Sequence, residues 1–148
     1  MSPEYQSADL ILKLYELRRE DTMRQARDWF LRFFPESAQD LIDAITGPNS
    51  AYYRMVTTYW EMATSFVNRD AIDENMFNDA NGEHIAVFSK LEPFIEEYRS
   101  IMKNPHYLRN LEDLVMRLPE ARTRLRSTRE RIKRMVGAQA AKAEKGDQ

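Results

Sequence analysis

The clearest helical pattern in the chain is SAYYRMVTTYWEMATSFVN, residues 50–68. Its apolar and aromatic side chains recur every three or four residues, which is the period of one face of a helix. Asn49 or Ser50 can cap the start of this helix, because short polar side chains satisfy the free N–H groups there. We therefore expect a buried helix with a wide apolar face, made of Tyr52, Val56, Tyr59, Trp60, Ala63, Phe66 and Val67.

Helical patterns continue toward the N-terminus, and no segment shows the alternation typical of a strand. The apolar stripe of the first part of the chain predicts one long helix from about Ser7 to Phe34. Pro35 would stop that helix, and Ser37 would cap a short helix that ends at Gly47.

Toward the C-terminus, further helical stripes are separated by residues that stop, bend or start a helix. These are Asn81-Gly82, Pro93, Asn104-Pro105 and Pro119. Short breaks between successive helices favour antiparallel neighbours. We therefore predict an all-α fold, an antiparallel helical bundle of five or six helices with a long first helix. Residues 1–136 would form this single domain, and residues 137–148 would form a disordered tail with too few apolar side chains to pack.

Composition excludes several classes of protein. A chain of 148 residues can bury a core without disulfides, and the absence of cysteine excludes disulfide frameworks, thiolate zinc sites and cysteine nucleophiles. No uncharged run approaches the roughly 20 residues of a membrane helix, and the N-terminus lacks the layout of a secretory signal. We therefore expect a cytoplasmic protein without a transmembrane segment. Its net charge of -2 gives no overall positive field for nucleic acid.

Signatures of catalysis and metal binding are missing from the sequence. GxSxG, GxGxxG, HExxH and glycine-rich phosphate loops do not occur. No glutamate lies three residues before His84 or His106, so the Glu-x-x-His pattern of di-iron bundles is also missing. We expect both histidines at exposed or capping positions. The sequence thus predicts no catalytic residue, no metal site and no cofactor, although it leaves an enzyme open.

Charge is distributed unevenly along the chain. Residues 117–134 carry a net charge of +6, whereas residues 70–97 carry -7. A second copy of the Arg-rich helix would oppose arginine with arginine, so the partner of this helix should be acidic. That partner is either the segment of this chain around Glu92, Glu96 and Glu97 or another molecule. One stripe of the helix should face outward as a candidate contact for an anion or a partner: Arg122, Arg126, Arg129 and Lys133.

Two long stretches, residues 11–45 and 71–118, carry a familiar pattern. Its residues are Leu14, Tyr15, Glu16, Leu17, Arg18, Trp29, Phe30, Ile72, Asp73, Phe77, Leu91, Pro93, Ile95, Arg99, Asn104 and Pro105. The pattern resembles a bacterial family of small uncharacterised all-helical proteins, a domain of unknown function. The resemblance implies a helical fold and no known reaction. Its polar members, Glu16, Arg18 and Arg99, are expected in ion pairs on or between helix surfaces.

By elimination, we expect a non-catalytic helical interaction or scaffold protein of bacterial type, with a protein partner or a homo-oligomeric state. Nucleic acid is disfavoured but left open. The first alternative is binding of nucleic acid or another anionic partner through the Arg-rich C-terminal helix. The second is a small-ligand carrier or an enzyme whose pocket is lined by the aromatic side chains.

Overall fold

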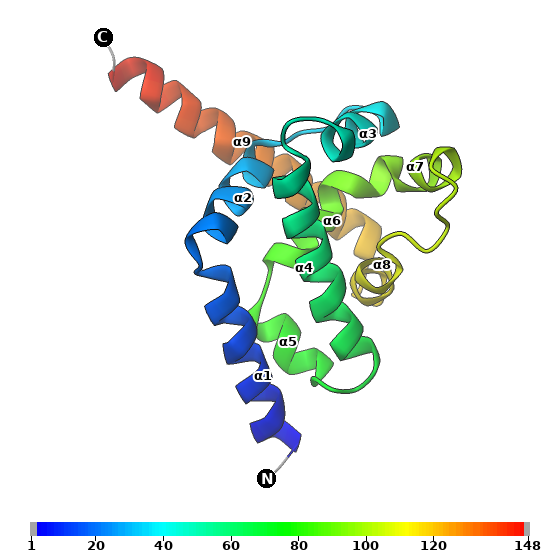
Figure 1. Ribbon diagram of the computed structural model, residues 1–148. Coiled ribbons are helices and arrows are strands. Elements are labelled where there is room, and N and C mark those ends of the chain that lie inside the picture. Colours follow the sequence, from blue (N-terminus) through cyan, green and yellow to red (C-terminus); the bar gives the residue numbers. More distant parts are fainter. Residues whose placement is uncertain (1–2, 147–148) are drawn as a thin grey trace.

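The structure, a computed structural model, describes residues 3–146, and its regular secondary structure there is entirely helical (Figure 1). This confirms the predicted all-α class. The α-helices are α1 (Pro3–Arg18), α2 (Asp21–Arg32), α3 (Ala38–Thr46), α4 (Ser50–Asn68), α5 (Glu74–Ala80), α6 (Glu83–Leu91), α7 (Ile95–Ile101), α8 (Arg109–Met116) and α9 (Ala121–Gly146). One 3₁₀ turn, η1 (Glu92–Phe94), joins α6 to α7.

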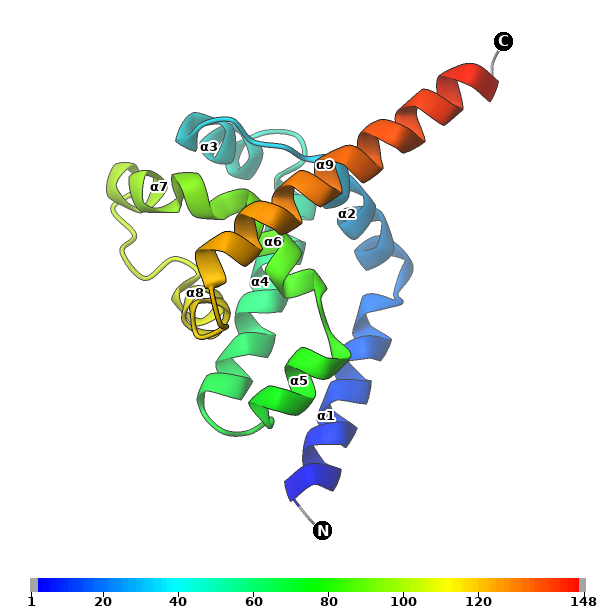
Figure 2. The same ribbon diagram turned by 180° about the vertical axis from the view of Figure 1, so that it is seen from behind.

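Helix α4 is the central element of the fold, as its pattern predicts. Tyr53, Tyr59 and Trp60 are buried, whereas Phe66, which was expected on the buried face, is 39% exposed. Helices α2 and α8 pack along α4 (Figure 1). Helix α9 crosses over α6 on the opposite side of the molecule (Figure 2). The largest fully buried side chains are Trp60, Tyr53, Phe77 and Phe88, so α4, α5 and α6 share one core. The far ends of α1 and α9 project from this body in different directions (Figures 1 and 2).

The prediction of one long first helix was wrong. The chain breaks at Arg19 and Glu20, and α2 starts anew at Asp21. Glu20 has an extended backbone, and its carboxylate accepts hydrogen bonds from the N–H groups of Thr22 at 3.0 Å and Met23 at 2.9 Å. These bonds cap α2, and they lower the pKa of the Glu20 carboxyl.

The predicted count of five or six helices was also wrong for the described residues, because several expected helices are divided. Pro93 lies in η1, which separates α6 from α7. Asn104-Pro105 does not start a helix: α8 begins only at Arg109, after Leu108 with a left-handed φ of 54°. The Arg99 guanidinium holds this turn by donating to the carbonyl of Tyr107 from Nε at 2.8 Å and from Nη2 at 2.6 Å.

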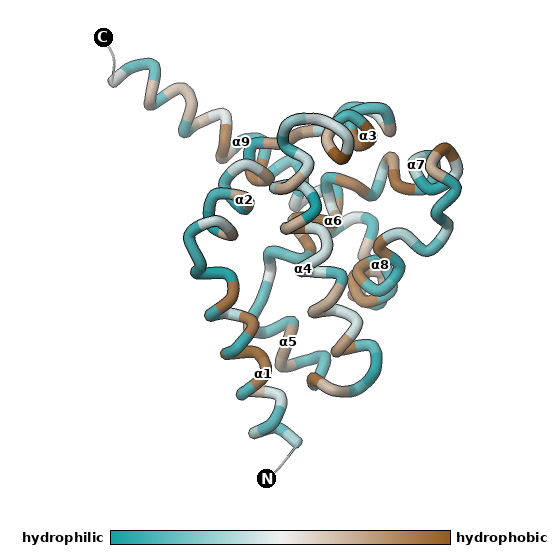
Figure 3. The backbone as a smooth tube through the Cα atoms, viewed as in Figure 1, coloured by the Kyte–Doolittle hydropathy of each residue, from teal (hydrophilic) through white to brown (hydrophobic). Residues whose placement is uncertain are grey.

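The far part of α9 has no packing partner among the described residues. The helix continues to Gly146, but every side chain from Gly137 onward is exposed, and few of these positions are hydrophobic (Figure 3). Residues 1–2 of the expected domain and residues 147–148 of the expected disordered tail lie outside the described residues. Disorder of residues 137–146 in solution stays a prediction.

Candidate functional site

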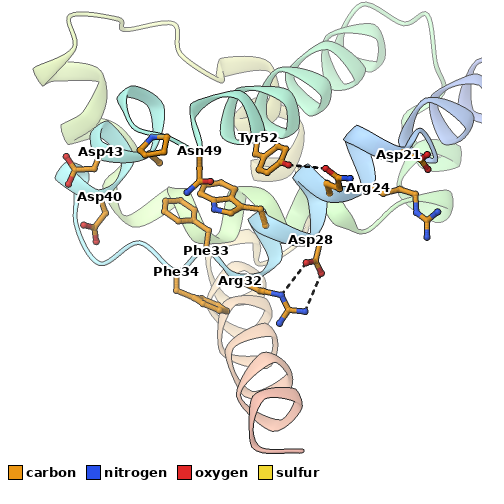
Figure 4. A pocket seen from close by; sticks show the side chains of 14 residues that line it. Asp21, Arg24, Asp28, Arg32, Phe33, Phe34, Asp40, Asp43, Asn49 and Tyr52 are labelled. Carbon is orange, nitrogen blue, oxygen red and sulfur yellow. Dashed lines mark hydrogen bonds and ion pairs between the residues drawn. The ribbon is translucent and has the colours of Figure 1, made fainter. Parts of the chain in front are cut away.

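A wide groove of about 1270 Å³ lies between α2, α3 and the start of α4 (Figure 4). Its aromatic lining comes from Trp29 of α2, from Phe33 and Phe34 just after that helix, and from Tyr52 of α4. Charged side chains lie around these rings. Helices α2 and α3 both pack against α4, and short connections at residues 33–37 and 47–49 join the three helices. The groove is open to solvent and exceeds the 300–1,000 Å³ of ordinary small-molecule pockets.

The aromatic part of the groove comes from the run WFLRFF, residues 29–34. One helical face cannot bury all of these rings. Phe30 is in the core, whereas Trp29 and Phe33, one turn apart, are half-buried. Their rings stack with centroids 4.9 Å apart and planes inclined by 16°. Phe33 also meets the buried ring of Tyr53 edge-on at 6.1 Å, so the core holds the stack in place.

Four carboxylates line the groove against two guanidinium groups, so the lining carries an excess of two negative charges. The acids are Asp21, Asp28, Asp40 and Asp43, and the bases are Arg24 and Arg32. Figure 4 shows the acids of α3 at one end of the groove and Asp21 with Arg24 at the other.

The acids of α3 are held by local hydrogen bonds rather than by cations. Asp40 accepts from the N–H of Glu36 at 2.8 Å, and Asp43 accepts from the amide of Gln39 at 2.9 Å. Asp28 pairs with Arg32 at 3.4 Å, and both side chains of that pair are more than half exposed. The α3 carboxylates are therefore fixed in direction and free to meet a cation from outside.

The largest pKa shifts belong to interior groups rather than to residues of this groove. His84 was expected at an exposed or capping position, but it is fully buried against Trp60 and Phe77. Its Nε2–H donates to Oδ1 of Asn78 at 3.0 Å. Burial lowers its pKa to about 4, with smaller contributions from the charges of Arg124 and Arg18. His106 is exposed, as expected.

Lys90 is a buried cation that the sequence analysis did not single out. Its Nζ donates to the carbonyls of Phe30 at 2.6 Å and Leu31 at 2.7 Å, in the last turn of α2, and lies 4.3 Å from the Phe34 ring centroid. Burial lowers its pKa to about 7, whereas the carbonyls and the ring face favour the charged ammonium. The geometry makes Lys90 a C-terminal cap that joins α6 to α2.

Two arginines of the family pattern, Arg18 and Arg99, are more deeply buried than arginines in surface ion pairs. Arg99 has 3% of its surface exposed and contacts Glu96 and Glu112 besides the Tyr107 carbonyl. Arg18 pairs with Glu83 at 3.4 Å and lies over the Trp60 ring, 5.2 Å from its centroid. Both arginines therefore connect helices within the fold. Glu16 is exposed, but it has no ion pair among residues 3–146, so the expected ion pair is not found there.

Of the four candidate residues on α9, two contact other parts of the chain and two do not. Arg122 pairs with Glu92 at 3.2 Å, and Arg129 donates to the carbonyl of Ser89 at 2.7 Å. The acidic segment of this chain therefore neutralises part of the positive charge on the Arg-rich helix. Arg126 and Lys133 are exposed and have no hydrogen-bond or ion-pair partner among residues 3–146.

Tyr53 is fully buried, and its hydroxyl lies 2.7 Å from that of Tyr107. The groove residues that the sequence analysis did not single out as a site are Trp29, which it named only as a member of the family pattern, and Phe33. The crowded aromatic run was the available signal, because six residues containing four rings exceed what one face of a helix buries.

Comparison with known proteins gives a family and no activity. Residues 4–118 match the model of a family described as "Domain of unknown function (DUF4760)". A search of curated proteins found no match, and neither did a search of solved structures. Within residues 3–146, no group of three or more His, Cys, Asp or Glu side chains is placed to hold a metal ion. None of the described helices combines the length and apolar character needed to cross a membrane.

Proposed function

The chain belongs to the family described as a domain of unknown function (DUF4760), and we propose that it is a non-catalytic protein-interaction module. Its groove between α2, α3 and α4 binds a basic segment of a partner protein that carries a large apolar side chain. The proposal includes a cytoplasmic location in a bacterium. The observation that carries it is the half-exposed Trp29–Phe33 stack flanked by fixed carboxylates.

Exposed aromatic stacks of this kind are suited to binding proteins. Tryptophan contributes much of the binding energy in protein interfaces, and a ring already fixed by its neighbours loses little conformational entropy on binding. Trp29 and Phe33 are fixed by each other and by Tyr53. An apolar anchor of the partner would cover the stack and remove it from water.

The charges that line the groove favour a partner segment of positive charge. Its lining has four carboxylates and two guanidinium groups, so an acidic segment would be repelled and a segment with lysine or arginine attracted. Asp40 and Asp43 lie at the α3 end of the groove, where they would pair with a cation on one side of the apolar anchor (Figure 4).

The test is selection of peptides that bind the wild-type protein, from a displayed library of random 12-residue peptides. Peptides that bind the bare support are removed. We expect the selected peptides to combine an aromatic or branched apolar residue with lysine or arginine. Asp40→Asn/Asp43→Asn should weaken their binding several-fold, because it removes both carboxylates of α3.

The matched control is Asp9→Asn/Asp79→Asn, which removes two exposed carboxylates outside the groove. This variant should bind the selected peptides as the wild type does. Selection of acidic peptides, or equal weakening by both double variants, would contradict the proposal. Light scattering at several protein concentrations then shows whether a second copy of the chain occupies the groove instead.

Binding of nucleic acid through the outward stripe of α9 is the second candidate, favoured by Arg126 and Lys133 alone. These two residues are exposed, whereas Arg122 and Arg129 contact the chain's own acidic segment and Ser89. Reversal of charge at Arg126 and Lys133 should abolish any such binding, and the affinity should fall steeply with salt.

A further inference from the structure

A second concave surface, of about 350 Å³, lies where the first part of α9 passes the start of α6. Gly82 and Ile85 line it from the start of α6. Its polar side chains come from Glu120 and the first part of α9: Glu120, Thr123, Arg124, Ser127, Thr128 and Arg131. It is separate from the groove on α2 and α3, with which it shares no lining residue. Its volume suits a small ligand.

Two guanidinium groups of this pocket have no partner of their own. Arg124 and Arg131 are seven residues apart on α9, so they project from the same side of the helix. Both are exposed, and neither guanidinium group has a hydrogen bond or an ion pair with another residue in the described part of the chain. Glu120 is the single acid of the described lining, which leaves one excess positive charge.

The start of α6 adds further positive potential to the same place. Gly82 occupies the N-cap position without a side chain, and the N–H groups of Glu83 and His84 donate to no acceptor among residues 3–146. Arg124 is near enough to this turn for its charge to lower the pKa of His84. The hydroxyl groups of Thr123 and Ser127 supply neutral donors beside the arginines.

We propose that this pocket binds one tetrahedral oxyanion of the phosphate class, either free or as the terminal group of a small phosphorylated molecule. Arg124 and Arg131 would pair with its oxygens from α9, and the free N–H groups of α6 would donate to it from the other side. The site differs from the outward stripe of Arg126 and Lys133, which lies on the opposite flank of α9 and includes no such helix start.

The test is a titration of the ¹⁵N-labelled full chain with inorganic phosphate, followed by ¹H–¹⁵N NMR at constant ionic strength. We expect saturable shifts at the amides of Gly82, Glu83 and His84 and at the side-chain Nε groups of Arg124 and Arg131. Sodium chloride should not reproduce them. Arg124→Gln/Arg131→Gln should weaken phosphate binding at least tenfold.

The control variant is Arg126→Gln/Lys133→Gln, which removes the same charge from the opposite flank of α9 and should bind phosphate as the wild type does. Parallel titrations with phosphoserine and adenosine 5′-monophosphate identify the carrier of the oxyanion by the tightest binding. Chemical shifts that do not saturate, or that sodium chloride reproduces, would overturn the proposal. Equal weakening of phosphate binding by both double variants would also overturn it.

Discussion

His84 makes the stability of the protein depend on pH. Its pKa is about 4 in the folded protein, against about 6.5 in an unfolded chain, because burial disfavours the imidazolium. Between these values the unfolded chain binds more protons than the folded one, so stability falls as the pH drops from 6.5 toward 4. The loss attributable to His84 is about 3 kcal/mol by linkage. Urea unfolding at a series of pH values measures it.

Two substitutions separate this effect from the general acid sensitivity of carboxylates. His84→Gln should flatten the decline in stability between pH 6.5 and 4, because it removes the group that gains a proton on unfolding. His106→Gln is the matched control, since this histidine is exposed, and it should leave the decline unchanged. An identical pH profile for all three proteins would show that His84 is not buried in its neutral form.

Arg99 holds the turn before α8, so its removal should destabilise the fold. Its guanidinium makes two hydrogen bonds to the Tyr107 carbonyl and contacts Glu112, while only 3% of the residue is exposed. Arg99→Met leaves the Tyr107 carbonyl without its donors, whereas Glu112 keeps its pair with Arg109, so the cost should be about 1–3 kcal/mol. Arg99→Lys keeps the charge but loses the paired donors, so it should cost less. Denaturant unfolding measures both variants.

The control for Arg99 is Lys13→Met, which removes an exposed ion pair with Asp9. Such pairs contribute about 0–1 kcal/mol, so this variant should unfold as the wild type does. Equal effects of Arg99→Met and Lys13→Met would mean that the turn before α8 is not held by Arg99.

At the level of helices, the break between α1 and α2 depends on Glu20. Its carboxylate accepts from two N–H groups of α2, and alanine cannot replace this cap. Glu20→Ala should lower the midpoint of thermal unfolding, Glu20→Ser should restore part of it, and Glu16→Ala, on the exposed side of α1, should leave it unchanged. A melting curve of Glu20→Ala that matches the wild type would refute the cap.

Helix α9 should divide into a structural part and a dispensable part. Leu125 and Ile132 are buried, and burial of such side chains contributes about 1.5–3 kcal/mol each. A chain that ends at Leu118 should therefore aggregate or unfold, as light scattering and circular dichroism would show. A chain that ends at Val136 should melt with the full protein, because residues 137–146 pack on nothing that the structure describes. Cooperative folding of the 1–118 chain would contradict this division.

The helical class and the core of α4 could be predicted from the sequence, because periodic apolar side chains are a local signal. The break at Glu20 could not, since a glutamate among Arg18, Arg19 and Asp21 looks like any charged helix surface. Burial of His84, Lys90 and Arg99 was also missed. A polar side chain is buried only when partners from other helices satisfy it, and for Lys90 these are carbonyls of α2, about 60 residues earlier in the chain.

The sequence shows the residue types of the candidate site, but it does not show that they come together. The sequence shows four rings in residues 29–34 and aspartates at positions 40 and 43, but their meeting in one groove depends on how α2 and α3 pack. For α9, charge alone favoured the stripe of Arg122, Arg126, Arg129 and Lys133. Two of these, Arg122 and Arg129, contact other parts of the chain. The distant contacts of a helix, and not its composition, decide which of its charges are available.

At the level of the whole molecule, the structure combines a rigid core with two separate concave surfaces on different helices. The groove is acidic and aromatic, and the pocket beside α6 is basic and rich in hydroxyl groups. A module with this arrangement can hold a protein segment and a small anion without competition between them. The two sites are therefore tested independently, each with its own pair of variants.

The most direct test of the proposed function is the affinity of one selected peptide for the wild-type and Trp29→Ala proteins, measured by isothermal titration calorimetry. Trp29 is half-buried, and among residues 3–146 its ring stacks on Phe33 and meets Phe30 edge-on, so the variant should stay folded. We predict at least a tenfold loss of affinity, or about 1.4 kcal/mol. Equal affinities for the two proteins would contradict the assignment of the groove as the binding surface.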